Sequence, residues 1–152
     1  MARQPLQAHI FLYRKAKNGF EYAIFRRSDH SECWQGICGG MEDDETVEQG
    51  AIRELFEESG VVPASPLHRL ETVSYIPTWI FSKEERQVWG EDVFVFPMYY
   101  FALEHNGDIR LSEEHTEYRW LDYPSAKRLL YFDDQRTALY ELDGKLTLGI
   151  IK

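Results

Sequence analysis

The chain has 152 residues, of which 43% are hydrophobic and 14% aromatic, and its formal net charge at pH 7 is −9. This length and apolar content predict a single folded domain, residues 1–152, with its own hydrophobic core, and they exclude a largely disordered chain. The acidic balance argues against a general nucleic-acid surface, which needs many Lys and Arg side chains, but a small nucleotide whose charge is balanced by metal ions stays compatible.

Three further classes are disfavoured by the sequence. No apolar run approaches the roughly 18 residues of a membrane span, and the first residues lack a basic region followed by an apolar stretch and a cleavage site. We therefore expect a cytoplasmic protein without membrane contact. Cys33 and Cys38 are too few for a disulfide framework and lack the partners of a zinc site, so we expect two reduced thiols.

The first half of the chain predicts a hairpin followed by a turn and a helix. Residues 8–13 and 22–25 are short apolar runs separated by polar residues and Gly19, which is the pattern of two antiparallel strands. A glycine-rich turn is predicted at residues 38–40. A helix is predicted from about residue 46 to residue 59, and Gly60 is suited to the left-handed conformation that ends a helix.

The second half predicts three strands and two helices. Strands are expected at residues 67–76, 93–103 and 118–121, and helices at residues 124–131 and 133–142. Pro97 predicts a bulge or an edge position for the second of these strands, and the polar segment at residues 82–92 reads as a loop. The acidic residues that open the last helix are suited to the positive end of its dipole. Strands interleaved with a few helices predict an α/β (α+β) sandwich.

The helix predicted after residue 46 gathers negative charge on one face. Glu54, Glu57 and Glu58 would lie within about 100° of one another, because positions three and four apart are neighbours on a helix. Like charges at this spacing destabilise a bare helix, so the arrangement favours a bound cation. Mg²⁺ is the natural candidate, because it prefers oxygen ligands and commonly links carboxylates to substrate phosphates.

The other side of this helix is expected to face the protein. Ile52, Leu55 and Phe56 form an apolar stripe that we expect to pack against a sheet, so that the acidic face looks outward. Gly50 and Ala51 are small enough to let a backbone or a ligand approach. A solvated acidic surface would be the simpler interpretation of an isolated pair of glutamates.

A longer pattern of fixed spacing argues against that simpler interpretation. Five residues separate the first glycine of the pattern from its first glutamate, and seven more precede an Arg-Glu-Leu sequence. The full set matches the fixed positions of the Nudix box: Gly39, Glu45, Arg53, Glu54, Leu55, Glu57, Glu58, Gly60 and Val61. The chain therefore resembles the Nudix hydrolases, which cleave nucleoside diphosphates linked to another group. This resemblance implies a Nudix-type α/β/α sandwich with a central mixed β-sheet.

The resemblance extends beyond the box. Residues 25–46 and 113–130 are similar to bacterial dATP or dihydroneopterin triphosphate pyrophosphohydrolases, whereas residues 62–105 match only loosely. We expect the loops that contact the substrate in this middle part. Asp44 replaces the glycine that usually precedes the second box position, and we expect a small effect because aspartate tolerates a positive φ at modest cost.

The resemblance implies a set of catalytic and metal-binding residues. Glu54, Glu57, Glu58 and Glu114 are expected to bind Mg²⁺, with Mn²⁺ as an alternative, and Glu113 is the fallback for Glu114. Water would be the nucleophile, and Glu58, Glu57 or Glu114 would take its proton.

Two neighbouring residues support this set. Arg53 is expected to pair with a box glutamate and hold its orientation, and Glu45 to do similar work. His115 follows the Glu113-Glu114 pair directly. It either orients a carboxylate or moves a proton, or it is an ordinary surface histidine.

Five residues are predicted to bind the substrate. Arg26 and Arg27 stand where the similar enzymes also have paired arginines, and one of them could hold phosphate, although neighbours on a strand face opposite ways. Trp34 and Trp89 are candidates for stacking on a base or pterin, with core packing as the alternative for each. Gly40 belongs to a turn whose backbone carbonyl is expected beside the metal.

Three functions are compatible with these residues. The first is hydrolysis of a dATP-like nucleoside triphosphate or dihydroneopterin triphosphate to the monophosphate and pyrophosphate. The second is another Nudix reaction, on ADP-ribose, a dinucleoside polyphosphate or an RNA 5′ end, and the third is a nucleotide-sensing domain without turnover. The complete carboxylate set disfavours the third. The partner would be the small-molecule nucleotide or pterin triphosphate, and an apolar edge at residues 93–103 would support a homodimer.

Overall fold

The computed structural model describes residues 3–151 and is built around one long central strand. In β1 (Arg3–Ala16) successive side chains point to opposite faces of the sheet, as strand geometry requires. Phe11 and Tyr13 pack into one buried apolar cluster, whereas Ile10 and Leu12 pack into a second cluster on the other face. Both faces of β1 are therefore covered, which explains its nearly continuous apolar sequence.

Six further strands complete a mixed sheet around β1. One side of β1 pairs with β2 (Gly19–Arg27) and β4 (Ile37–Glu42), both antiparallel, and the other side pairs with β6 (Val95–Glu104), which is parallel. Beyond β6 lies β5 (His68–Pro77), while β3 (Trp34–Gln35) and β7 (His115–Leu121) pair with β2. The predicted central mixed sheet and the predicted hairpin of β1 and β2 are confirmed.

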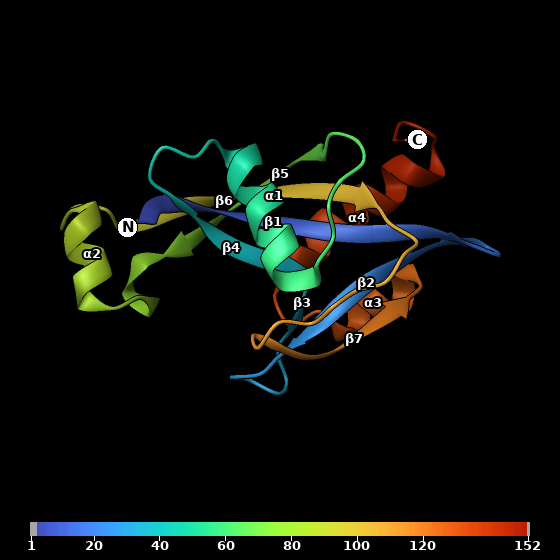
Figure 1. Cartoon of the computed structure of the whole chain (residues 1–152), viewed down its shortest axis with the longest axis horizontal. Helices are drawn as coiled ribbons and strands as arrows, with labels where there is room; N and C mark the ends of the chain where they lie inside the picture. Colours follow the sequence, from blue (N-terminus) through green and yellow to red (C-terminus); the bar gives the residue numbers. More distant parts are fainter. Residues whose placement is uncertain (1–2, 152) are drawn as a thin grey trace.

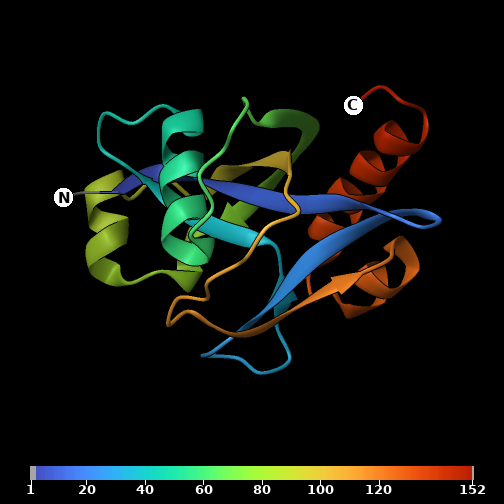
Figure 2. The same ribbon diagram turned by 45° about the vertical axis from the view of Figure 1, so that its right-hand side comes forward.

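Helices lie on both faces of this sheet (Figure 1). Figure 2 shows α1 (Val47–Ser59) on one face, with α3 (Tyr123–Leu129) and α4 (Asp133–Thr147) on the other. A short 3₁₀ helix (Thr78–Ile80) and α2 (Lys83–Trp89) lie near the N-terminal end of β1. The α/β/α architecture is therefore as predicted. Among residues 3–151 no helix is both long and apolar enough to cross a membrane.

Two segments differ from the expected local structure. The segment at residues 82–92, predicted as a loop, contains α2, because the Ser82 side chain accepts a hydrogen bond from the Glu85 N–H (3.1 Å) and caps the helix. Trp89 is consequently a helix residue, and its ring packs edge-on against Phe81 and Phe96. The turn predicted at residues 38–40 is also wrong, because these residues belong to β4.

Helix α1 is rotated relative to the prediction. Ile52 and Phe56 are 41% and 48% exposed, whereas Glu54 and Glu58 are only 7% and 3% exposed. The face toward the sheet combines these two acids with Ala51, Leu55 and Gly50. A Cβ on Gly50 would lie 2.0 Å from the Sδ of Met41, so the helix approaches β4 closely along its small residues. The expectation of an outward acidic face is therefore wrong for two of the three glutamates.

The position of β6 also differs from the prediction. It lies between β1 and β5, so it is not an edge strand. Among the described residues, the pairing of β6 with β5 is irregular only opposite the stretch from Arg69 to Val73, away from Pro97. Pro97 pairs with Tyr75 on β5, but the ladder with β1 begins only at Met98. Pro97 is tolerated because its missing N–H is not needed by β1. The apolar edge expected to support a homodimer is thus covered by β5, and the homodimer stays a prediction.

Candidate active site

A cavity of about 840 Å³ opens where strands from both halves of the sheet end. Its wall is formed by β1 and β4, by the last residues of β2, and by the segment that leads into β7. The end of β5, the 3₁₀ helix and the first turn of α4 complete it. These elements are distant in sequence, so only the folded chain creates the cavity. Two of the predicted metal ligands, Glu54 and Glu114, line it.

Helix α1 is fixed at both ends. Thr46 precedes its first residue and exchanges hydrogen bonds with Gln49, each accepting from the other's backbone N–H at 3.1 and 2.9 Å. Gly60 ends the helix with φ of 72°, as predicted. Asp44 adopts φ of 68°, so aspartate takes the left-handed conformation at the position where the family usually has glycine. The acidic residues of α1 are therefore held in a defined register above β4.

Arg53 connects α1 to the β4–α1 turn. Its Nε donates to Glu45 Oε2 (2.7 Å), its Nη1 to Glu54 Oε1 (3.0 Å) and Glu57 Oε2 (3.2 Å), and its Nη2 to the Gly40 carbonyl (2.9 Å). The hydrogen bond with Glu45 is the main cause of the raised pKa of Arg53 and of the lowered pKa of Glu45. The guanidinium thus stays charged and orients Glu54 and Glu57 through a planar fork that lysine lacks.

Glu54 is placed against the backbone of β4. Its carboxyl is so close to Gly39 that a Cβ at that position would lie 2.0 Å from the Glu54 Cδ. Burial raises the pKa of Glu54 to about 6, although Arg53 acts in the opposite direction. A nearby cation would therefore favour the ionised form of Glu54 over its protonated form.

Replacing Gly39 by Ala is expected to displace the Glu54 carboxyl with little effect on folding. Gly39 does not have a positive φ, so alanine suits its backbone, and the clash falls on the end of a flexible side chain. We expect kcat to fall about 10- to 100-fold, because small displacements of catalytic groups have effects of this size. Gly144→Ala is the matched control, since nothing lies within 4 Å of its added Cβ. Full activity of Gly39→Ala in a steady-state assay would show that the position of Glu54 is not critical.

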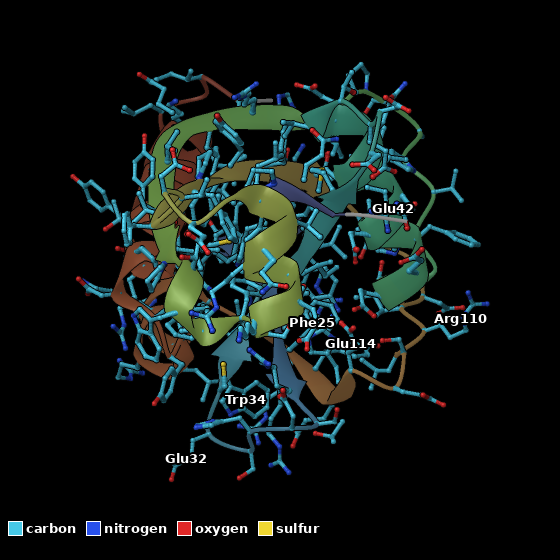
Figure 3. All side chains as sticks on the ribbon, turned by 90° about the vertical axis from the view of Figure 1, so that its left-hand side faces the viewer. Phe25, Glu32, Trp34, Glu42, Arg110 and Glu114 are labelled. Atoms are coloured by element: carbon cyan, nitrogen blue, oxygen red, sulfur yellow. The ribbon has the colours of Figure 1, made fainter. Side chains whose placement is uncertain are left out.

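Two carboxyl groups, from Glu58 and Glu114, meet near the C-terminal end of α1. The Ser112 hydroxyl donates to Glu58 Oε1, and the carboxyl of Glu114 lies beside the Glu58 carboxyl. Figure 3 shows Glu114 below the end of α1, on the segment that leads into β7. Burial and then the proximity of Glu114 raise the pKa of Glu58, whereas Ser112 lowers it. The structure therefore brings Glu114 to the box, as predicted, and adds Ser112.

His115 lies behind this pair and is not a surface residue. It is 5% exposed, burial lowers its pKa, and its Nε2 lies 3.5 Å from the Nε2 of Gln35. The alternative of an ordinary surface histidine is therefore wrong. A neutral imidazole packed against Phe25 (ring centroids 5.3 Å apart) instead supports the start of β7 beside Glu114.

The paired arginines have different environments. Arg27 lines the cavity and forms a bidentate pair with Asp29, with distances of 2.8 and 2.5 Å. Arg26 points away from the cavity lining and pairs with Glu117 (3.2 Å). The expectation that only one of the two enters the site agrees with this placement. Arg27 is consequently the arginine that a phosphate could reach.

Neither predicted tryptophan lines the cavity. Trp34 is 6% exposed and belongs to the core, with the Arg119 guanidinium 4.7 Å from its ring. Trp89 packs at the end of α2. Aromatic side chains from Tyr75, Trp79 and Phe132 line the cavity instead. The packing alternative stated for both tryptophans is the one that the structure supports.

Sequence patterns did not point to several residues of the site. Ser112 precedes the Glu113-Glu114 pair but carries no spacing signal, and Asp29 follows Arg27 as an ordinary loop residue. Asp134 and Gln135 line the cavity, although the acids at the start of this helix were assigned only to its dipole. No sequence signal places these two residues at the cavity, because their position depends on how α4 packs against the sheet.

The oxygen-rich wall is chemically suited to a hard divalent cation. Glu54 and Glu114 supply carboxylates to it, Glu58 lies beside Glu114, and a divalent ion would offset the repulsion between these like charges. Within residues 3–151, however, no three His, Cys, Asp or Glu side chains already converge as metal ligands. Metal binding would therefore require side-chain rearrangement that brings these carboxylates around one ion.

Comparison with known proteins gives one family. The NUDIX domain model matches residues 4–142. The dihydroneopterin triphosphate diphosphatase of Escherichia coli (strain K12) is 29% identical over 139 residues, which cover 90% of this chain and 91% of that protein. The asymmetrical bis(5′-nucleosyl)-tetraphosphatase of Rattus norvegicus is 29% identical over 123 residues, 80% of this chain and 77% of that protein. A crystal structure described as a NUDIX hydrolase from Listeria monocytogenes superposes with a TM-score of 0.84 at 32% identity, covering 98% of this chain and 99% of that one.

Proposed function

The chain belongs to the NUDIX domain family of hydrolases, and on this premise we propose that it converts a nucleoside triphosphate or dihydroneopterin triphosphate into the monophosphate and pyrophosphate, with Mg²⁺ as the metal. The observation that carries the proposal is that Glu54 and Glu114 line the same cavity, with Glu58 beside Glu114. A cavity of about 840 Å³ is within the usual size of small-molecule sites. The similarity to the Escherichia coli enzyme over 139 residues supports a triphosphate of this kind.

The metal site would be formed from α1 and the segment before β7. Glu54, Glu57, Glu58 and Glu114 would bind the ion, and Arg53 would hold the first two in place through its 3.0 and 3.2 Å hydrogen bonds. When bound, Mg²⁺ neutralises phosphate oxygens and lowers the pKa of a coordinated water. Glu57 is half-exposed at the rim, so we assign it the outermost position.

We assign the role of proton acceptor for the attacking water to the Glu58–Glu114 pair. The two carboxyls lie side by side, and burial together with Glu114 raises the pKa of Glu58. Ser112 donates to one Glu58 oxygen and so holds the carboxyl in place beside Glu114. Arg27 would bind a phosphate oxygen after exchanging part of its contact with Asp29, because its fork suits phosphate geometry.

Cleavage of a dinucleoside polyphosphate is the second candidate. The similarity to the Rattus norvegicus tetraphosphatase supports it, although over a smaller share of the chain. Both reactions would use the same carboxylates and differ in the group held at the far end of the cavity. ADP-ribose and RNA 5′ ends are alternatives within the same family. A sensor without turnover has no need for the Arg53 network that orients the acids.

A screen of related phosphate compounds tests the proposal, because the family alone does not fix the substrate. The purified chain with Mg²⁺ would be assayed for pyrophosphate release from dATP, GTP and dihydroneopterin triphosphate, and for cleavage of diadenosine tetraphosphate, ADP-ribose and triphosphorylated RNA. We expect pyrophosphate and a monophosphate from a triphosphate, and no reaction with EDTA. Cleavage of only the dinucleotide would replace the first candidate with the second, and cleavage of only ADP-ribose or RNA would replace both. Tight binding without turnover would overturn both.

A further inference from the structure

The first turn of α4 places an unpaired polar group in the cavity. Gln135 is 3% exposed, lines the cavity, and its Oε1 has no hydrogen-bond partner among the described residues. An unsatisfied buried carbonyl is unfavourable, so an amide oxygen in this position indicates a missing partner. The missing partner must be a hydrogen-bond donor, because Oε1 can only accept.

Asp134 adds a second acceptor beside it. Its Oδ1 accepts the backbone N–H of Gln135 (2.9 Å), which orients the carboxylate at the cavity wall. A carboxylate has about four lone-pair sites, so the side chain retains capacity for further donors. Two neighbouring residues therefore present acceptors to the same space.

The groups packed around these acceptors add no positive charge. The buried His9 has a pKa lowered to about 3, mainly by burial and partly offset by Gln135, so its imidazole is neutral. Its Nε2 accepts from the Gly36 N–H (3.1 Å), which places the proton on the buried Nδ1. An amide oxygen accepts two hydrogen bonds, so a small shift that bonded Gln135 to His9 would still leave one lone pair for a ligand. The Tyr100 hydroxyl exchanges a hydrogen bond with Ser74 (2.9 Å) and also lies beside the Asp134 carboxylate, where it can use one of the lone pairs of that carboxylate.

The same cavity has aromatic walls suited to a flat ring. Phe132 immediately precedes α4 and is 40% exposed, while Tyr75 and Trp79, which lie at and just beyond the end of β5, are 64% and 76% exposed. Exposed aromatic side chains that line a cavity commonly stack on planar ligands. Acceptors at the start of α4 and aromatic surfaces beside them together describe a site for a heterocycle.

We propose that Asp134 and Gln135 bind the edge of a ring with adjacent N–H donors, as in the 2-amino-4-oxopyrimidine edge shared by guanine and pterins. This edge presents a ring N–H beside an exocyclic amino group, so both donors find acceptors. Adenine instead presents an amino group beside an unprotonated ring nitrogen, whose lone pair would face a carboxylate. The site therefore discriminates against 6-aminopurines. This inference rests on the proposed function, in which the triphosphate extends from the ring toward Glu54.

Steady-state kinetics on three triphosphates test the inference. We expect kcat/KM for GTP and dihydroneopterin triphosphate to exceed that for ATP at least tenfold. Asp134→Asn replaces an acceptor by a donor, so it should lower kcat/KM for the first two about 10- to 100-fold, mainly through KM, and change the value for ATP less than about threefold. Asp133→Asn is the matched control, because its side chain is 96% exposed and pairs with Arg136 outside the cavity.

Binding without phosphate separates this inference from the proposed function. Equilibrium binding of neopterin, guanosine and adenosine, followed by intrinsic tryptophan fluorescence, should show the same order in the absence of turnover. Gln135→Met removes the acceptor at similar volume and provides a second variant if Asp134→Asn does not fold. Equal losses for guanine and adenine ligands, or a preference for adenine in the unmodified chain, would overturn the inference. If this binding order is observed but no pyrophosphate is released, only the proposed function is overturned.

Discussion

Replacing Glu58 by Gln is expected to lower kcat for pyrophosphate release at least about 10³-fold, because one change removes a proton acceptor and a metal-binding carboxylate. The fold should be retained, since glutamine has the same shape and can still accept from Ser112. It also removes the like-charge contact between Glu58 and Glu114. Activity would be measured by coupled pyrophosphate detection at saturating Mg²⁺.

The same variant should be more stable than the unmodified chain in the absence of metal at neutral pH. The folded-state pKa of Glu58 is raised above its unfolded value, so the folded chain holds a proton that the unfolded chain releases. The contribution of Glu58 to stability is therefore complete below about pH 4.5, its unfolded pKa, and is lost as pH rises through the higher folded pKa. The stability difference between Glu58→Gln and the unmodified chain should thus grow with pH, as measured by urea unfolding in EDTA.

Glu48→Gln is the control for this experiment. Glu48 is an acid in the first turn of α1, half-exposed, with only a 3.6 Å ion pair to Arg69. Its replacement changes the net charge by the same amount, and surface pairs of this kind contribute little. Loss of activity in both variants would indicate an effect of charge and not of Glu58. A Glu58→Gln enzyme with more than a tenth of normal activity would contradict the assignment of its role.

Replacing Arg53 by Lys is expected to reduce kcat/KM about 10²-fold although positive charge is retained. An ammonium group cannot reproduce the planar fork that reaches Glu45, Glu54 and the Gly40 carbonyl together. The Glu54 and Glu57 carboxylates would lose their orientation, so we expect a larger effect on kcat at saturating Mg²⁺ than on substrate KM. The free energy of unfolding should fall by roughly 1–3 kcal/mol, because charged hydrogen bonds at a partly buried site are lost.

Thermal unfolding and activity titrations in Mg²⁺ would distinguish these effects. Arg86→Lys is the matched control, because Arg86 lies on the exposed helix α2, where its Nε makes only a 3.4 Å contact with the Ser82 carbonyl. The control should keep full activity and stability. If Arg53→Lys retained normal kcat and lost only stability, Arg53 would be a structural residue without influence on the carboxylates.

Much of the fold was predictable because its signals are local. The hairpin of β1 and β2 follows from two apolar runs around Gly19, and the ends of α1 follow from Thr46 and Gly60. The prediction failed for α2, where a polar composition concealed a capping box at Ser82 and Glu85. It also failed for the rotation of α1, because apolar spacing alone selected Ile52 and Phe56 for the interface. Burial of Glu54 and Glu58 depends instead on the close approach permitted by Gly39 and the contact with Ser112.

The sequence by itself determined the family, the box residues and the order of most strands and helices. These properties depend on residue types at fixed short spacings, which local backbone geometry converts into one helix and its caps. Only the tertiary structure decided which carboxylates are buried and what they contact. Ser112 meets Glu58 across 54 residues, and the first turn of α4 reaches the cavity lined by Glu54 and Glu114 from the other face of the sheet. Such contacts arise from strand pairing and layer packing, which no short spacing encodes.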